Sequence, residues 1–412
     1  MRRGDTVVGL DLGTTKICVA IAELGAEGIE IIGYGHRSSD GLRRGAVVDA
    51  EKTVQAVRGA VHQAELMAGI EIEAVLASIS GEHIRGFDSR GSIAVGDGGP
   101  EVTQEDRDRV VEAARTVAIP FDREVLHVLP QEFSIDDQAG IRDPVGMTGV
   151  RLESSVHIVT GAATSVRNIS RNIERTEMEV DGIVVEPLAS SRAVLRQEEK
   201  DVGVCVVDIG GSTTDLAIHC DGSVRRTSVV GVGGQNATSD IAICLRTSWP
   251  LAEDMKCRYG MALAECADKN DVVQLKGVGG RKPVEVAKRD LATIIEARMK
   301  EIFAMVRREI DGSGYGDRLG AGIVLTGGGS LVEGAVELAE RSIGIPVRLG
   351  VPAAFPGVGE RLANPCYAAV LGLVLMAADA DSCGFSQHPE GTGSGVFGAA
   401  AGRMKNWIAT FL

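Results

Sequence analysis

Two segments far apart in this chain repeat the same pattern of residues. Residues 8–16 read VGLDLGTTK, and residues 206–215 read VVDIGGSTTD. In each, an apolar run ends at an aspartate, a glycine turn with two threonines follows, and a second strand-like run begins after the turn. An internal repeat of this kind predicts a chain of two related halves, each containing a strand–turn–strand hairpin.

The residues of the two turns are suited to binding phosphate. Backbone N–H groups and hydroxyls that point in one direction bind phosphate oxygens, and an aspartate can hold Mg²⁺, usually through water. Lys16 adds a positive charge for the β- and γ-phosphates. One such turn alone is compatible with a plain hairpin, but two turns facing each other would enclose a triphosphate from both sides.

Three further segments extend this interpretation. Residues 325–330 (LTGGGS) place three glycines after an apolar run, where a flat adenosine can lie against bare backbone, although a glycine turn is weak evidence by itself. Glu186 begins the helix that links the halves and supplies a carboxylate. Glu253 and Lys256, three apart on one helix face, either belong to the nucleotide site or form a solvated surface pair.

Composition limits the class of protein. A chain of 412 residues is too long for one hydrophobic core, and 53 glycines with only 3% aromatic residues suit an α/β architecture with many tight turns. The net charge of −14 argues against a surface that seeks nucleic acid. The eight cysteines show no C-x-x-C spacing, which predicts free thiols and no metal site.

No part of the chain predicts a secretory signal or a membrane span. The N-terminus passes directly into a strand, and the longest apolar run, residues 366–378, is shorter than the roughly twenty residues that a bilayer requires. That run is expected to be a buried helix.

The order of elements follows from hydrophobic periodicity and turn residues. The pattern of predicted elements changes over residues 84–161. This segment predicts an inserted module of one strand, one helix capped by Thr103 and two more strands. The predicted strands are 6–10, 17–24, 74–79, 92–95, 124–133, 151–160, 181–185, 202–209, 215–220 and 323–326. The predicted helices are 49–67, 103–117, 168–177, 188–196, 238–245, 251–259, 288–309 and one from the GGG turn to 341.

The C-terminal residues predict an amphipathic helix after a polar tether. Apolar residues recur at three- and four-residue spacing, Arg403 and Lys405 flank them, and no acidic residue follows Glu390. This pattern favours a helix lying on an anionic membrane over one docked on the core or on a partner. The predicted membrane-facing residues are Phe397, Met404, Trp407, Ile408, Phe411 and Leu412.

As an ordered set, these motifs resemble the actin, DnaK-type chaperone and sugar kinase superfamily. Within it, the chain is similar to the FtsA family of bacterial cell-division proteins over nearly its whole length. The segments that carry the resemblance are VVGLDLGTTKICVAIAEL, EPLASSRAVL, VVDIGGSTTDLAI, GGQNATSDIAICL, AEDMKCRYG, IVLTGGGSLVEG and NPCYAAVLGL. Ser212 departs from the family pattern, in which a glycine is common at that position of the second turn.

The resemblance implies an actin-like two-lobed α/β fold that binds ATP and Mg²⁺. By the resemblance, Glu186 matches the position that orients the hydrolytic water or the magnesium shell. Asp11 and Asp208 match the positions near the metal ion. Any hydrolysis of ATP is expected to be slow. The implied nucleotide-binding residues are Asp11, Gly13, Thr14, Thr15, Lys16, Asp208, Gly210, Gly211, Ser212, Thr213, Thr214, Gly234, Glu253, Lys256, Gly327, Gly328, Gly329 and Ser330.

The resemblance also implies a division of the chain. Residues 1–83, 162–198 and 360–380 would form the first lobe, with 84–161 as the FtsA-specific inserted subdomain. Residues 199–232 and 301–359 would form the second lobe, with 233–300 as its small subdomain. Residues 381–395 would be a linker and 396–412 the membrane-targeting helix.

The function implied by the resemblance is anchoring of the tubulin-like protein FtsZ to the inner face of the cytoplasmic membrane at the division septum. Later division proteins would bind the inserted subdomain, and copies of the chain would assemble into filaments; no nucleic-acid partner is expected. Lys288, Arg289 and Arg298 are candidates for the FtsZ C-terminal tail, although exposed helical charges are usually only solvated. The alternatives are a pilus-assembly adaptor and a small-molecule kinase of the same fold; no kinase base is recognisable between the turns.

Overall fold

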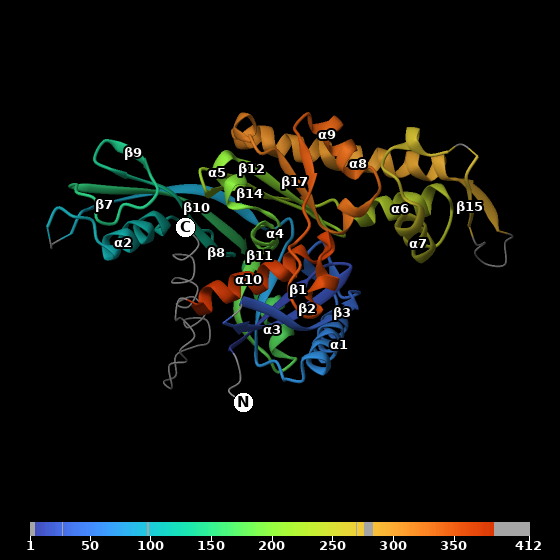
Figure 1. The fold of residues 1–412 in the computed structure, drawn as a ribbon, viewed down its shortest axis with the longest axis horizontal. Helices are drawn as coiled ribbons and strands as arrows, with labels where there is room; N and C mark the ends of the chain where they lie inside the picture. Colours follow the sequence, from blue (N-terminus) through green and yellow to red (C-terminus); the bar gives the residue numbers. More distant parts are fainter. Residues whose placement is uncertain (1–4, 27, 97–98, 269, 276–282, 383–412) are drawn as a thin grey trace.

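The fold consists of two lobes with a smaller subdomain attached at each end (Figure 1). The structure is a computed structural model that describes residues 5–26, 28–96, 99–268, 270–275 and 283–382. The predicted helix at 396–412, its membrane-facing residues and most of the tether lie outside the described residues. None of the described helices combines the length and apolar character needed to cross a membrane.

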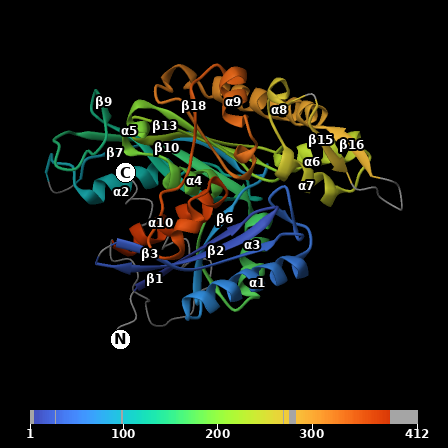
Figure 2. The same cartoon turned by 45° about the vertical axis from the view of Figure 1, so that its right-hand side comes forward.

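The first lobe is built on a five-stranded sheet with the order β11-β6-β1-β2-β3. Strands β1 (Asp5–Leu12), β2 (Lys16–Gly25) and β3 (Gly28–Ser38) form an antiparallel meander, and β6 (Ala74–Ile79) and β11 (Glu179–Val185) continue it in parallel. Helices α1 (Ala50–Ala68) and α3 (Ala163–Glu174) lie on one side of the sheet, and α10 (Ala368–Ser382) packs on β1 and on α4 (Glu186–Val194) on the other (Figure 2).

The second lobe repeats this plan in the order β14-β13-β12-β17-β18. Strands β12 (Val204–Ile209), β13 (Thr214–Cys220) and β14 (Ser223–Val230) form the meander, and β17 (Ile323–Thr326) and β18 (Val347–Leu349) run parallel to β12. Helix α5 (Gln197–Val202) precedes β12, and α8 (Lys288–Ser313) and α9 (Ala335–Ile343) cover the sheet. The two halves predicted from the sequence repeat are therefore present.

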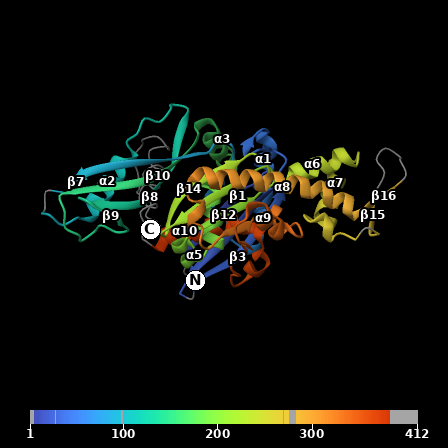
Figure 3. The ribbon, with the colours of Figure 1, turned by 90° about the horizontal axis from the view of Figure 1, so that it is seen from above.

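Two smaller units lie at opposite ends of the molecule (Figure 3). The inserted subdomain contains β7 (Arg85–Ala94), α2 (Gln104–Arg115), β8 (Arg123–Ile135), β9 (Gln138–Ile141) and β10 (Arg151–Ala162). The other unit contains α6 (Gly234–Cys244), α7 (Trp249–Tyr259), β15 (Val272–Leu275) and β16 (Val284–Ala287). The remaining named elements are the short strands β4 (Leu42–Arg43) and β5 (Ala46–Val47) and several 3-10 turns.

The helix ends show which sequence signals were reliable. The predicted cap of α2 is confirmed, because Thr103 Oγ1 accepts from the N–H of Asp106 at 3.2 Å and the Asp106 carboxylate accepts from the N–H of Thr103 at 3.1 Å. The helix predicted to follow the GGG turn directly is wrong. Gly334 has φ of 78°, a left-handed conformation, so a 3-10 turn comes first and α9 begins only at Ala335.

Several strands were missed or misjudged. The predicted 92–95 strand is the end of the much longer β7, and β9 was not predicted, so the inserted sheet has four strands in the order β7-β10-β8-β9. The edge strands β3 and β18 and the hairpin of β15 and β16 were also missed. Strand β14 was missed as well. Its first residues alternate between buried and half-buried, and the strand contacts β7 and β8 of the inserted subdomain.

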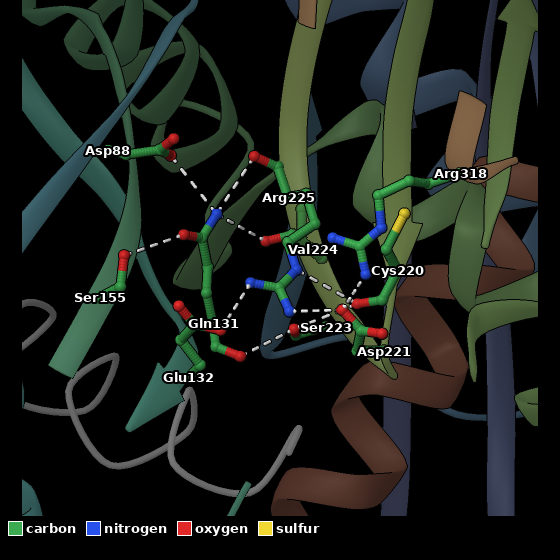
Figure 4. A network of polar contacts seen from close by, with 10 residues as sticks. All are labelled: Asp88, Gln131, Glu132, Ser155, Cys220, Asp221, Ser223, Val224, Arg225 and Arg318. Atoms are coloured by element: carbon green, nitrogen blue, oxygen red, sulfur yellow. Dashed lines mark hydrogen bonds and ion pairs between the residues drawn. The ribbon is translucent and has the colours of Figure 1, made fainter. Parts of the chain in front are cut away.

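The inserted subdomain is bonded to the second lobe although its chain leaves and re-enters the first (Figure 4). The Gln131 side-chain amide donates to the carbonyls of Val224 at 3.3 Å and Arg225 at 3.1 Å. The Arg225 side chain, only 7% exposed, forms ion pairs with Asp221 at 2.9 Å and with Glu132 of the inserted subdomain at 3.7 Å. The subdomain is thus held to both lobes.

Candidate functional site: two aspartate hairpins

The two predicted turns face each other where the lobes meet. Thr14 Oγ1 of the first turn and Ser212 Oγ of the second are 2.7 Å apart, within hydrogen-bond distance. A side chain at Gly211 would place its Cβ only 2.4 Å from Thr15 Cγ2, so the second turn can approach the first only with glycine there. The opposed arrangement that the sequence repeat predicted is present.

Each copy of the repeat ends its first strand in a buried aspartate held by a serine. Asp11 lies near the end of β1 and accepts from Ser78 Oγ at 2.8 Å; the same hydroxyl accepts from the N–H of Leu12 at 3.0 Å. Asp208 lies near the end of β12 and accepts from the hydroxyl of Ser190. Each serine thus fixes the orientation of one carboxylate.

Two more carboxylates join this pair. Glu186 begins α4, and burial together with the charges of Asp215, Asp208 and Asp11 raises its pKa well above the usual range. Burial and the charge of Asp11 raise the pKa of Asp208 to about 6. Burial and the charge of Asp208 raise the pKa of Asp215 to about 7. Four acidic groups therefore interact in one low-dielectric region.

Lys16 is the cation of this cluster. Its ammonium donates to the carbonyl of Cys366 and lies 4.1 Å from the centre of the Tyr367 ring. Burial is the largest cause of the raised pKa values of the four carboxylates, and the one nearby positive charge does not offset it. The cluster is short of positive charge.

The donor set fits a hydrated magnesium ion. One oxygen of Asp215, Oδ2, is buried without a hydrogen-bond partner in the described chain, and Ser80 Oγ donates to the other at 2.6 Å. No group of three or more His, Cys, Asp or Glu side chains in the described residues is arranged to ligate a metal ion directly. Carboxylates that are near one another but not arranged as a direct cage suit a cation that keeps its water molecules, as Mg²⁺ does.

The third turn lies against the second hairpin. Gly327 has φ of 81°, and a Cβ on it would come within 2.1 Å of Asp208 Oδ1. A Cβ on Gly329 would lie 2.3 Å from Ile209 Cγ2, whereas Gly328 is exposed and its nearest contact would be Cys366 Cβ at 4.0 Å. Ser330 is buried and donates to the carbonyl of Gly327 at 2.7 Å. The turn leaves bare backbone exposed at Gly328, as the adenosine prediction requires.

Glu253 and Lys256 are not a solvated surface pair. Lys256, with a side chain only 11% exposed, donates to Glu253 Oε2 at 2.8 Å, to Thr238 Oγ1 at 2.8 Å and to the carbonyl of Gly234 at 3.1 Å. The N–H of Gly234 in turn donates to the carbonyl of Gly210 at 2.9 Å. The pair therefore connects α7 to the start of α6, directly beside the second turn. Its contact with base or ribose stays a prediction.

The three candidate partner cations differ in their surroundings. Lys288 forms an ion pair with Asp271 at 2.5 Å. Arg298 donates to both carboxylate oxygens of Asp240, at 2.6 and 2.9 Å, which ties α8 to α6. Among the residues described, Arg289 has no side-chain hydrogen bond or ion pair, and it is the one of the three with a guanidinium free to bind a partner.

Sequence reasoning missed the serines and one acid of the site. Ser78 lies near the end of β6, which pairs with β1, and Ser80 follows the last residue of that strand. Ser190 lies in α4. Polar residues that end an apolar strand are a usable signal, but their contact with Asp11 and Asp215 depends on strand pairing that the sequence does not state. Asp215 closes the second repeat motif and was not assigned a role.

Comparison with known proteins agrees with this geometry. The family model described as "Cell division protein FtsA" matches residues 205–372, and the model of the SHS2 domain inserted in FtsA matches residues 81–160. The chain is 43% identical to the cell division protein FtsA of Pseudomonas aeruginosa, over 99% of this chain and 98% of the relative. It is 37% identical to that of Escherichia coli K12, over 98% and 97% of the two chains.

Solved structures of low sequence identity share the fold. A chain of the PilM–PilN type IV pilus biogenesis complex has a TM-score of 0.64 at 17% identity, covering 90% of this chain and 98% of that one. MreB5 of Spiroplasma citri bound to ADP has a TM-score of 0.55 at 13% identity, covering 93% and 100%. These structures establish the actin-like fold, and the full-length relatives establish the family: the chain belongs to the FtsA family of cell-division proteins.

Proposed function

We propose that this protein binds Mg²⁺-ATP between its lobes and uses the bound state to link FtsZ to the membrane during division. The observation that carries the nucleotide assignment is the convergence of Asp11, Glu186, Asp208 and Asp215 on one region with a single lysine. Such an excess of buried acid is stabilised when a cation binds among the carboxylates.

Different residues of the site would bind the metal ion and the phosphates. Asp11 and Asp208, each oriented by a serine, would hold the water shell of the metal ion. The backbone N–H groups and threonine hydroxyls of both turns would bind phosphate oxygens, with Lys16 beside them. Bound Mg²⁺-ATP supplies positive charge at the metal and a γ-phosphate open to attack by water.

Glu186 would orient that water molecule. Its raised pKa holds its proton while the cluster is uncompensated, and a nearby cation favours the ionised carboxylate, which can accept a hydrogen bond from water. Catalysis by positioning and charge alone, with no covalent nucleophile, suits slow turnover in which the nucleotide acts as a switch.

The membrane link is proposed for residues 396–412. An apolar face that carries Phe397, Trp407 and Phe411 binds weakly as one copy, because folding a short helix in water opposes the gain from burying it. Several copies on one filament would bind strongly through their effective concentration.

A vesicle sedimentation assay tests both assignments. The full chain with Mg²⁺-ATP should sediment with phosphatidylglycerol-containing vesicles, and deletion of residues 396–412 should abolish sedimentation while leaving fluorescent ATP binding intact. Asp208→Asn should weaken nucleotide binding without removing the membrane helix. Unchanged sedimentation of the deleted chain would contradict the membrane link, and unchanged ATP affinity of Asp208→Asn would contradict the nucleotide site.

The FtsZ contact is tested through Arg289, since reversing Arg298 would break its ion pair with Asp240. Arg289→Glu should reduce capture by an immobilised FtsZ C-terminal tail peptide. Arg308→Glu serves as the charge-matched control, because Arg308 is exposed further along the same helix and has no side-chain hydrogen bond or ion pair among the described residues. Equal loss in both variants, or in neither, would reject Arg289 as the contact.

A further inference from the structure

A cavity lies where three units of the fold meet, and no residue of the two aspartate turns lines it. It has a volume of about 80 Å³ and is walled by β8 of the inserted subdomain, by α4 and α10 of the first lobe, and by α5 and the β13–β14 turn of the second. The apolar part of its lining is Leu129, Pro130, Leu188, Val224 and Met376. The polar part includes Ser191, Arg192, Lys200, His219 and Ser223.

The cavity carries one positive charge without a direct counter-ion. Arg192 is neutralised by Asp379, to which its Nε donates at 3.0 Å and its Nη2 at 3.3 Å. The Lys200 ammonium, by contrast, has no hydrogen bond or ion pair with any described residue. Burial, and after it the charge of Arg192, lowers the pKa of Lys200, and the charges of Asp379 and Asp201 do not offset these two effects. A lysine in this position is poorly solvated and has no carboxylate of the described residues bonded to it.

The neighbouring histidine adds no charge. Burial, together with the charge of Lys200, lowers the pKa of His219 to about 3, so its ring is neutral at neutral pH. Its Nε2 lies 3.1 Å from Ser191 Oγ. Because Ser191 Oγ donates its one hydrogen to the carbonyl of Pro187 at 2.7 Å, His219 Nε2 is the donor to Ser191 Oγ. The Nδ1 of the neutral ring is then an acceptor, so His219 offers neither a charge nor a hydrogen-bond donor to an anion.

We propose that this junction cavity binds a small organic anion, a single carboxylate on a short apolar body. The carboxylate pairs with Lys200, and the body contacts Leu129, Leu188 and Met376. One free positive charge matches a monoanion better than a phosphate, which carries about −1.5 to −2. A volume of about 80 Å³ holds on the order of five to eight water-sized groups, the size of a six-carbon acid or one terminal residue.

A ligand in this cavity would act on the arrangement of the three units. Pro130 and Val224 line the cavity and also lie in or beside the polar network that holds the inserted subdomain to the second lobe (Figure 4). Occupancy therefore strengthens the contact between that subdomain and both lobes at once. The same chemistry is available from a free short-chain acid and from the carboxyl end of a peptide.

Calorimetric titration of the full chain distinguishes these sources. Hexanoate should bind saturably at millimolar concentration, and its neutral analogue hexanamide should not. A peptide with the sequence of residues 409–412 is tested as free acid and as amide. Binding of hexanoate identifies a free acid as the source; binding of the peptide acid alone identifies a peptide end.

Lys200→Met tests the assigned cation. Because the Lys200 ammonium has no direct partner, this variant should fold with an unchanged or higher melting temperature while binding the acid at least roughly tenfold more weakly, as expected for loss of a desolvated ion pair. Lys52→Met is the matched control, because Lys52 is an exposed residue of α1 outside the cavity, and it should bind like the parent chain. Absence of saturable binding by both acids, equal affinity for acid and amide, tighter binding of inorganic phosphate, or full affinity in Lys200→Met would overturn the proposal.

Discussion

Replacing Asp215 by asparagine should make the stability of the nucleotide-free protein less dependent on pH. The pKa of Asp215 is raised to about 7 by burial and by Asp208, whereas an unfolded aspartate titrates near 3.9. A group with a raised folded pKa gives its full stability below the unfolded pKa and loses it as pH rises through the folded pKa. The wild-type chain therefore loses stability between about pH 4 and pH 7.

The size of the effect follows from the two pKa values. Ionisation of Asp215 lowers the free energy of unfolding by roughly 1.5 kcal/mol at pH 5 and about 4 kcal/mol at pH 8, a difference of about 2–3 kcal/mol. The asparagine variant has no such contribution, and removing the charge also relieves Glu186, whose pKa Asp215 helps to raise. In the variant, a side-chain amide atom takes the place of Asp215 Oδ2, which is buried and has no hydrogen-bond partner in the described chain. This lowers the free energy of unfolding by about 1–3 kcal/mol, and the loss is the same at both pH values.

Thermal melting followed by circular dichroism, without nucleotide or magnesium, measures this difference. Relative to wild type, Asp215→Asn should gain about 3–5 °C in melting temperature on going from pH 5 to pH 8. Asp40→Asn, an exposed acid after β3, is the control and should show no such gain. The same shift at both pH values for Asp215→Asn would refute the argument that burial and the charge of Asp208 raise the pKa of Asp215.

Two further predictions concern the turns. Gly327→Ala should lower the free energy of unfolding by several kcal/mol, because the new Cβ would lie 2.1 Å from Asp208 Oδ1. Gly314→Ala is the control for backbone strain alone, because Gly314 has a similar φ of 76° and its Cβ would meet nothing within 4 Å. The control should cost only about 1 kcal/mol, and urea denaturation measures both variants. Ser212→Ala removes the 2.7 Å contact with Thr14 and should speed amide hydrogen exchange in both turns, with little change in melting temperature; exchange that is unchanged in the first turn would show that the hydroxyls do not couple the lobes.

The repeat of aspartate, glycine and threonines predicted the main architecture from sequence. The repeat predicted two related halves with one hairpin each and suggested that the two turns face each other, and the resemblance to the FtsA family implied the two-lobed actin-like fold. Local signals were also reliable where one side chain decides the outcome, as with Thr103 at the start of α2. The start of α9 depends on the left-handed conformation of Gly334, and the pattern of apolar residues therefore placed that helix start too early in the chain.

The tertiary structure alone decided which side chains complete the site. Ser78, Ser190 and Asp215 reach the acidic cluster through strand pairing and helix packing between segments that are distant in the chain, and no local pattern encodes such contacts. The same holds for Lys200, whose place among residues of three units in one cavity appears only in the folded chain. The sequence by itself determined the elements and the chemistry of the turns, because these depend on near neighbours; the structure determined burial and charge balance, because these depend on what folding brings together.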